Sequence, residues 1–282
     1  MSDLDRLKKL QIVVSDLDGT LIKNDGSIGP ETKKLVRELH KYGVLFSFAT
    51  GRLHSAVEGL ANELEINNPI ISLDGCLIKN FPGGETIFES FMKPKYVKRA
   101  IKFAENFLLN IALCHSDAIY YTEFNSVIPR ILNKYGARYE EVDSYDNYLK
   151  GTLEIVYAGD NNDSVKFVRD KFGFPFAFGC SASYYRSHSQ QGVYYLDIRR
   201  AGSSKGLGLK RLLKYLKIKP EHAAVMGDWY NDISMFESKA VKVAVANSIP
   251  ELLRMADHVT ERSNNSEGAA EFLEMILKAK TS

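Results

Sequence analysis

Short, continuously apolar segments that each end in polar residues or glycine recur along this chain and constrain its fold most strongly. Most are followed by a helical pattern, and they are Ile12–Val14, Leu45–Ala49, Ile70–Leu73, Ala223–Met226 and Val241–Val245. Strands without alternating polar residues are typical of a parallel sheet that helices cover on both faces. Ligands bind such sheets at the carboxyl ends of the strands. We therefore predict an α/β fold whose chemistry lies at the polar strand ends.

Helix signals flank these segments near both ends of the chain. Pro30 opens a predicted helix over Glu31–Tyr42, and Gly43 stands just past its end. Ser248 and Glu251 have the spacing of a capping box, which predicts another helix start.

A second, inserted domain is predicted between these flanking regions. Twelve of the fifteen tyrosines fall between Tyr96 and Tyr195. The predicted helices and strands of this stretch are Lys95–Leu109, Asn110–Cys114, Ala118–Phe124, Leu153–Tyr157, Asp163–Phe172, Phe176–Arg186 and Val193–Arg199. Hinge-like Phe81–Gly84 and Ala201–Ser204 would connect it. We expect a core of residues 1–81 and 201–282 with an α+β sandwich inserted at 82–200.

Composition excludes several classes of protein. The formal charge of the 282-residue chain is +2, too small for a field that attracts nucleic acid or a membrane to the whole molecule. No apolar run approaches the roughly 18 residues that a membrane helix needs. Three scattered cysteines indicate neither a disulfide framework nor a zinc site. We expect a soluble, cytoplasmic protein without nucleic-acid or membrane partners; its oligomeric state is unknown from the sequence.

Paired carboxylates follow the first strand. Asp16 and Asp18 project to one side of an extended backbone. Two ionised carboxylates at short range favour a bound cation, and all-oxygen ligands favour Mg²⁺. A solvated Asp-Gly turn is the alternative for this pair alone.

A later strand ends in Gly227–Asp232, which supplies two more carboxylates and an amide. Asp228 could complete a cation site with the first pair. Asp232 could instead cap the helix that begins at Ile233.

Two further positions suit a phosphate group. Thr50–Arg52 ends a strand directly before a helix, where a hydroxyl and free N–H groups can hold an anion, or Thr50 could simply cap that helix. Lys205 begins another helix, where a cation opposes the helix dipole unless anions lie opposite. Walker and dinucleotide-binding glycine patterns are absent, and no Ser/His/Asp set stands out.

Taken in order, Asp16–Thr20, Thr50–Arg52, Lys205 and Gly227–Asp232 resemble the four motifs of the haloacid dehalogenase-like (HAD) hydrolases. The insert between the second and third motifs, with Asn247 and the residues after it, is similar to subfamily IIB, the Cof-like phosphatases. The resemblance implies a Rossmann-like parallel-sheet core domain with an inserted α+β sandwich cap domain that determines substrate specificity.

The resemblance also implies a Mg²⁺-dependent phosphomonoester hydrolase. Asp16 would be the nucleophile that forms an aspartyl-phosphate, and Asp18 the acid and base. Mg²⁺ would bind Asp16, the main chain of Asp18, and Asp228, with Asp232 orienting its waters. The phosphoryl oxygens would be held by Leu17 N–H, Thr50, Gly51, Lys205 and Asn231. The expected substrate is a small phosphorylated metabolite such as a sugar phosphate.

Alternatives remain at this point. A phosphomutase or phosphotransferase acting on sugar phosphates keeps the same aspartates. A non-catalytic phosphate-ligand sensor is suggested by the bulky Trp229 and Tyr230, which replace smaller residues of the family's fourth motif; we expect both to pack beneath the Lys205 helix. A dehalogenase is disfavoured because halide leaves without a proton, so Asp18 would have no task.

One residue after the third apolar segment departs from the family pattern, and the insert contains three polar candidates for substrate contacts. Asp74 stands where Asn is common. In the insert, His115, Arg186 and His188 are the candidates for contacts with substrate, and we expect their side chains to be solvated.

Overall fold

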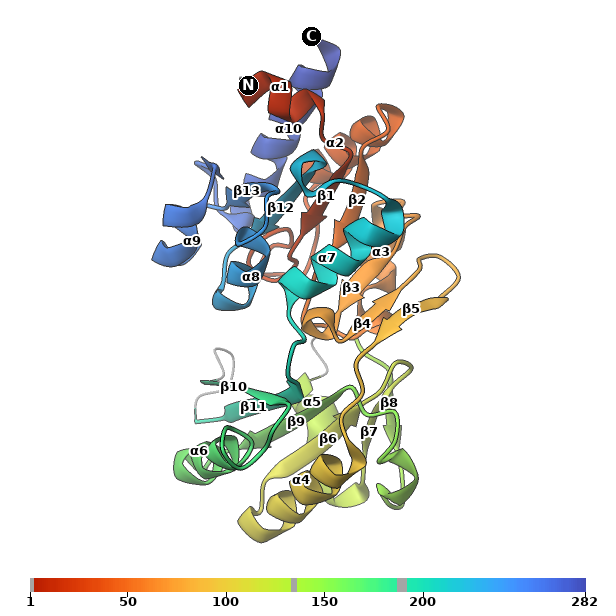
Figure 1. Cartoon of the computed structure of the whole chain (residues 1–282), viewed down its shortest axis with the longest axis vertical. Helices are drawn as coiled ribbons and strands as arrows, with labels where there is room; N and C mark the ends of the chain where they lie inside the picture. The colour runs from red at the N-terminus through yellow and green to blue at the C-terminus, as the bar shows by residue number, and fades with distance from the viewer. Residues whose placement is uncertain (1–2, 133–135, 187–191) are drawn as a thin grey trace. The chain divides into compact units, whose positions relative to one another are not determined.

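The computed structural model describes residues 3–132, 136–186 and 192–282, which form two compact units (Figure 1). Unit 1 contains Met1–Gly51, Glu58–Ile87 and Ser204–Ser282. Unit 2 contains Arg52–Val57 and Phe88–Ser203. The α/β architecture agrees with the sequence-based prediction.

Unit 1 is built on a five-stranded parallel sheet. Its strands, in spatial order, are β14 (His258–Val259), β13 (Val241–Ala244), β12 (Ala223–Gly227), β1 (Ile12–Ser15) and β2 (Leu45–Phe48). All residues of β1, an interior strand of the sheet, are buried, as expected for a sheet covered on both faces. Four of the five apolar segments therefore form this sheet. In-register pairing of Ser15 with Met226 and Phe48 aligns the carboxyl ends of three strands.

The fifth apolar segment forms a separate sheet. Strand β3 (Ile70–Ser72) pairs with β4 (Leu77–Lys79), and β5 (Thr86–Glu89) follows, while a single Ala49–Ile71 bridge joins β3 to the end of β2. The predicted connector Phe81–Gly84 is the turn of the β4–β5 hairpin, closed by Asn80 N–H donating to Glu85 O at 2.8 Å. This hairpin belongs to unit 1, which continues to Ile87.

The helices of unit 1 are α1 (Asp3–Lys8), α2 (Pro30–Lys41), α3 (Glu58–Glu63), α7 (Lys205–Leu216), α8 (Ile233–Phe236), α9 (Pro250–Met255) and α10 (Gly268–Thr281). Helix α2 begins at Pro30 as predicted, and a distant residue caps it: Thr32 N–H donates to Glu267 Oε2 at 2.9 Å. The predicted capping box is absent, because Ser248 Oγ donates to Gly227 O at 3.1 Å.

Unit 2 contains a six-stranded sheet. Its strands, in spatial order, are β10 (Cys180–Arg186), β11 (Tyr194–Arg200), β9 (Glu154–Gly159), β6 (Asn110–Cys114), β7 (Ile119–Tyr121) and β8 (Tyr139–Glu141). Helices α4 (Pro94–Phe107) and α6 (Asn162–Lys171) pack on one face, and α5 (Ile128–Leu132) follows β7 in the chain. Strand β10 begins four residues later than predicted, so Phe176 lies in a loop.

Among the described residues, none of the helices combines the length and the apolar character that spanning a membrane requires.

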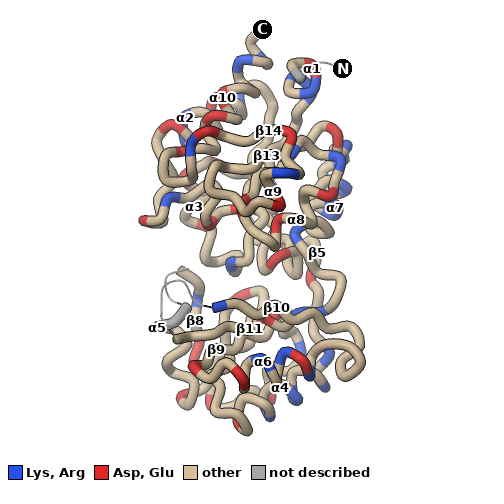
Figure 2. The backbone as a smooth tube through the Cα atoms, turned by 90° about the vertical axis from the view of Figure 1, so that its left-hand side faces the viewer, with Lys and Arg blue, Asp and Glu red and all other residues tan. Residues whose placement is uncertain are grey.

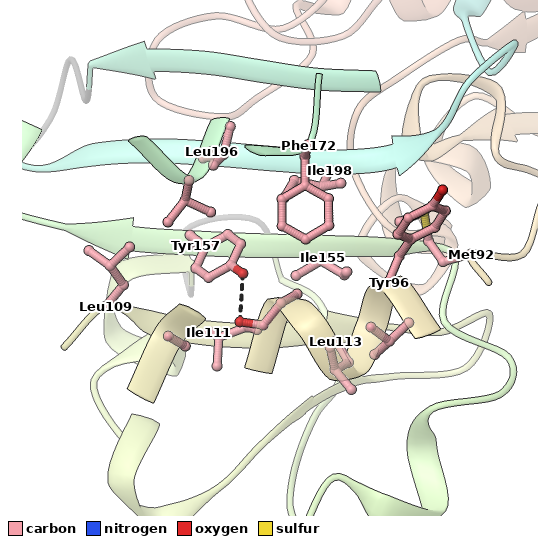
Figure 3. Close-up of a cluster of buried hydrophobic side chains, with 14 of the residues drawn as sticks. Met92, Tyr96, Leu109, Ile111, Leu113, Ile155, Tyr157, Phe172, Leu196 and Ile198 are labelled. Carbon is pink, nitrogen blue, oxygen red and sulfur yellow. Dashed lines mark hydrogen bonds between the residues drawn. The ribbon is translucent and has the colours of Figure 1, made fainter. Parts of the chain in front are cut away.

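The core of unit 2 lies between its sheet and the α4–α6 pair (Figure 3). Tyr157 is fully buried there, and its hydroxyl donates to Ala100 O of α4 at 2.7 Å, which satisfies the one polar atom of the ring. At the ends of the insert, Ser203 Oγ donates to Ser90 Oγ at 3.0 Å.

Candidate active site

The ends of β1 and β12 bring buried carboxylates together. Asp16 N–H donates to Met226 O at 2.9 Å, which continues the β1–β12 pairing by one residue. Carboxylate oxygens of Asp16, Asp228 and Asp232 all lie within 4.8 Å of one another, and the three side chains are buried. The two predicted strand ends thus form one acidic site within unit 1.

Lys205 lies inside this site. Ser204 caps α7 by accepting from Leu207 N–H at 3.2 Å, which fixes Lys205 as the first helical residue. The Lys205 Nζ donates to Asp16 Oδ1 at 2.5 Å and to Asp232 Oδ1 at 2.7 Å. As the sequence predicted, anions face the cation at the helix start.

Two glycines allow α7 to pack closely against α8 and β3. A Cβ atom at Gly206 would collide with Ser234 O of α8, and one at Gly208 would collide with the Ile71 side chain of β3. These glycines, which weaken the helix intrinsically, therefore place its amino terminus against the strand ends.

Asp232 and Thr20 orient the carboxylates. Asp232 Oδ2 accepts from the N–H groups of Asp228 and Trp229 at 3.0 Å each, while its other oxygen binds Lys205. Thr20 Oγ1 donates to Asp228 Oδ1 at 2.7 Å. Asp232 thus ties the Gly227–Asp232 turn to Lys205 and does not cap α8 with its side chain.

The electrostatics of the site favour a cation. Burial raises the pKa of Asp16 well above its ordinary value, and Lys205 only partly opposes that rise. Burial also raises the pKa of Asp228, to about 6. Burial alone would lower the pKa of Lys205, but the charges of Asp16, Asp232 and Asp74 raise it. Three ionised carboxylates around one ammonium leave two negative charges unbalanced, and a divalent ion with oxygen ligands such as Mg²⁺ fits this donor set.

Asp18 lies apart from the three buried carboxylates. Its side chain is exposed, whereas Leu17 before it is fully buried. The chain turns at Gly19, whose φ of +83° suits glycine and where a Cβ would collide with Asp228. Ile22 N–H closes the turn by donating to Leu17 O at 3.0 Å. Asp18 is therefore on the solvent side of the strand end.

The remaining predicted residues of unit 1 meet beside β2 and β3. Asp74 N–H donates to Thr50 O at 2.9 Å, and Asn231 Nδ2 donates to Asp74 Oδ1 at 3.1 Å. A Cβ at Gly51 would lie 3.5 Å from Asp74 Oδ1. Asp74 adopts a left-handed backbone with φ of 48°, a conformation in which Asn and Asp are enriched.

Trp229 and Tyr230 do not pack beneath α7, contrary to expectation. They are 45% and 55% exposed, and their rings contact each other edge to face at a centroid distance of 5.3 Å. Asp232 holds the main chain of this turn, which leaves the two side chains facing solvent.

The insert candidates lie in unit 2 and differ from one another. Arg186 is exposed at the end of β10, as expected. His188 is outside the described residues. His115 is partly buried: its Nε2 lies 3.0 Å from Tyr148 O, its ring contacts Tyr120 edge to face, and burial lowers its pKa. The expectation of a solvated His115 was wrong.

Two residues of the site, Thr20 and Asp74, were assigned no role from the sequence. Thr20, which orients Asp228, closes the first motif, and Asp74, which binds Asn231, follows the apolar segment Ile70–Leu73. Their position directly after predicted strands was the signal that could have found them.

Comparison with known proteins agrees with this geometry. A family model described as haloacid dehalogenase-like hydrolase matches residues 13–273. The chain belongs to the haloacid dehalogenase-like hydrolase family. This match confirms the resemblance seen in the sequence and identifies the protein as an enzyme of that family.

Relatives and solved structures extend the comparison to nearly the whole chain. Phosphatase YwpJ of Bacillus subtilis is 25% identical, covering 95% of this chain and 100% of its own. Phosphoglycolate phosphatase 1 of Saccharolobus solfataricus is 26% identical, covering 96% and 97%. A haloacid dehalogenase-like hydrolase from Bacteroides thetaiotaomicron has a similar fold, with a TM-score of 0.83 at 23% identity over 95% of this chain and 99% of that one.

Proposed function

We propose that this HAD-family enzyme is a Mg²⁺-dependent phosphomonoester hydrolase acting through an aspartyl-phosphate on Asp16. One observation carries the proposal: the Asp16 carboxylate is buried beside the Lys205 ammonium and two further carboxylates at the ends of neighbouring parallel strands. An anionic nucleophile that attacks an anionic phosphoryl group needs positive charge nearby to offset the repulsion between the two anions. Lys205 would supply one such charge, and a divalent ion held by the carboxylates would supply the other.

The chemistry follows from the positions of the two aspartates. An Asp16 oxygen attacks phosphorus, the bond from phosphorus to the ester oxygen breaks, and Asp18 donates a proton to that oxygen. Water then attacks the phosphorus of the aspartyl-phosphate, and Asp18 accepts the water's proton. The bond between phosphorus and the Asp16 oxygen breaks, which releases phosphate and restores the Asp16 carboxylate. The exposed position of Asp18 suits a group that must reach both a leaving alcohol and a water molecule.

The other residues would bind and orient. The carboxylates of Asp16 and Asp228 with the main chain of Asp18 would hold Mg²⁺, which supplies charge to neutralise the phosphoryl oxygens. Asp232 would fix Lys205 and the turn that carries Asp228. The phosphoryl oxygens would be bound by Leu17 N–H, Thr50, Gly51, Lys205 and Asn231.

A small phosphorylated metabolite, such as a sugar phosphate, is the proposed substrate. A relative named for phosphoglycolate, itself a small phosphomonoester, supports this size class. We propose that residues 82–200 form the cap that selects the leaving group, with His115, Arg186 and His188 as candidate contacts.

The test replaces the nucleophile. Asp16→Asn should lower kcat on a panel of phosphomonoesters with Mg²⁺ by at least about 10⁴-fold, because the amide cannot attack phosphorus. Asp25→Asn, at an exposed loop position, is the matched control and should keep the parent's rate. Phosphate release by Asp16→Asn at the parent's rate would exclude this mechanism. Transfer to an added sugar phosphate without net release would favour the phosphomutase.

A further inference from the structure

Unit 2 carries a cluster of exposed aromatic side chains that the proposed chemistry does not use. Phe174, Phe176 and Phe178 are 82%, 53% and 66% exposed, and Phe167 of α6 is 42% exposed. The first three lie on one loop, Gly173–Gly179, between α6 and β10. Exposed apolar groups gathered in this way mark interaction surfaces.

Hydrogen bonds to helix α4 fix the main chain of this loop, so its phenyl rings project from a defined backbone. Arg99 of α4 donates to Phe176 O, and the Tyr96 hydroxyl donates to Phe178 O, both at 2.9 Å. Phe172 and Ala177 anchor the loop in the core, where they are 0% and 3% exposed. The remaining phenyl rings face solvent because the buried positions are already filled.

Cations flank these rings. Helix α4 carries the basic residues Lys95, Lys98, Arg99 and Lys102 against the single acidic Glu105, and Figure 2 shows Lys and Arg on both α4 and α6. The Lys171 Nζ lies 4.2 Å from the Phe176 ring centroid and 5.1 Å from that of Phe167. Helix α4 is bonded to the aromatic loop through Tyr96 and Arg99. We term the four exposed Phe residues, Lys171 and the basic residues Lys95, Lys98 and Lys102 of α4 the aromatic–basic surface.

We propose that the aromatic–basic surface docks on an anionic lipid bilayer. Rings projecting from one ordered loop can enter the headgroup region, while the adjacent ammonium groups pair with lipid phosphates. A second copy of this chain fits less well, because the same positive charges would face each other. The expectation of no membrane partner rested on the charge of the whole chain, and that sum does not describe a local surface.

Vesicle sedimentation tests the proposal with the full chain. We expect pelleting with vesicles of phosphatidylcholine containing about one third phosphatidylglycerol, and none with phosphatidylcholine alone. Replacing the three loop phenylalanines together by Ser (F174S, F176S, F178S) should weaken binding about 1,000-fold, at roughly tenfold for each ring. Lys95→Gln with Lys98→Gln and Lys102→Gln should weaken it at least about tenfold.

Matched controls separate docking from folding. Phe124→Ser removes another ring of unit 2, 73% exposed, and should keep the parent's binding. The thermal midpoint of each variant verifies folding. If a variant unfolds, a Phe178→Trp, Trp229→Phe double variant replaces it, and brominated phosphatidylglycerol should quench its tryptophan emission. Absence of pelleting by the parent, equal binding by the triple Ser variant, or absence of quenching would overturn the proposal, and none of these results bears on phosphatase activity.

Discussion

Each unit buries a cluster of charged side chains, and the two clusters are built differently. In unit 2, Arg199 Nε and Nη2 donate to both oxygens of Glu154 at 3.0 and 3.3 Å, and Nη2 also donates to Asp197 at 3.2 Å. These residues lie within strands β9 and β11, where Arg199 and Glu154 are register partners. In unit 1, Lys205 and Asp16 come from a helix start and a strand end.

The carboxylates of the unit 2 cluster are bound by a guanidinium within the cluster, whereas the unit 1 cluster has excess negative charge that a ligand can neutralise. The guanidinium of Arg199 engages both oxygens of one carboxylate, so the unit 2 cluster is closed by its own hydrogen bonds. The ammonium of Lys205 engages one oxygen each of Asp16 and Asp232, and Asp228, which accepts from the neutral Thr20 hydroxyl, adds a further negative charge. Excess negative charge at strand ends is suited to binding a metal.

The largest effect is expected from Lys205→Met. Removing the ammonium leaves buried carboxylates uncompensated, so the free energy of unfolding should fall by about 3–5 kcal/mol in EDTA, and kcat/KM should fall at least about 10³-fold. Denaturant titration and phosphate release measure the two effects. Lys214→Met, at an exposed position of the same helix, is the control. Indistinguishable behaviour of the two variants would refute the central role of Lys205.

Arg199→Met should affect stability alone. Breaking the unit 2 cluster should also lower the free energy of unfolding by about 3–5 kcal/mol. Activity per folded molecule on a small activated phosphoester should persist, because the reacting groups lie in unit 1. Arg200→Met, at the exposed next position, controls for loss of a charge. A loss of this activity as large as that of Lys205→Met would contradict the separation of the clusters.

The free energy of unfolding should depend on pH because of the unbalanced negative charge in the unit 1 site. With a folded-state pKa of about 6 against an ordinary 3.8, Asp228 holds a proton in the folded protein where the unfolded chain has lost it. Raising pH from about 4 to about 6 in EDTA should therefore cost up to about 3 kcal/mol of stability. Asp228→Asn should make that slope shallower and leave the part that the raised pKa of Asp16 contributes, and Mg²⁺ should oppose the slope in the parent. If plots of the free energy of unfolding against pH were parallel for the parent and Asp228→Asn, this account would be wrong. Asp143→Asn in unit 2 is the control.

The smallest effects are expected from two helix caps. Ser204 caps α7, and Asn161 caps α6 by accepting from Asp163 and Ser164 N–H at 3.0 Å each. Replacing either cap by Ala should cost about 1 kcal/mol. Only Ser204→Ala should also lower kcat/KM, because its helix begins with Lys205. Thermal midpoints and rates of both variants test this, and equal rates would show that the cap does not position Lys205.

The sequence predicted most of the unit 1 site because its parts are local. Asp16, Thr50 and Asp228 each lie within two residues of the end of an apolar run, and parallel pairing brings the carboxyl ends of such runs to one edge of the sheet. Lys205 was recognisable because a cation at a helix start requires anions opposite. Short-range patterns with a topological rule were sufficient there.

Long-range contacts were not predictable in the same way. The Arg199–Glu154 pair depends on strand register, which apolar patterning alone does not specify. Glu267 caps a helix more than two hundred residues away in the chain, so the local pattern around Pro30 gave no sign of it. Trp229 was expected to be buried for its size, but the fixed main chain of its turn decides where the ring lies.

The hydrogen bond between Ser90 and Ser203, at 3.0 Å, has an evolutionary consequence. Because this bond joins the two ends of the segment Phe88–Ser203, the segment leaves and re-enters the rest of the chain at neighbouring positions, as inserted modules do. A lineage can lengthen, replace or lose such a module while inheriting the host unchanged. Under the proposed division of roles, diversification of the recognised molecule and preservation of the reaction can then proceed as separate histories within one gene.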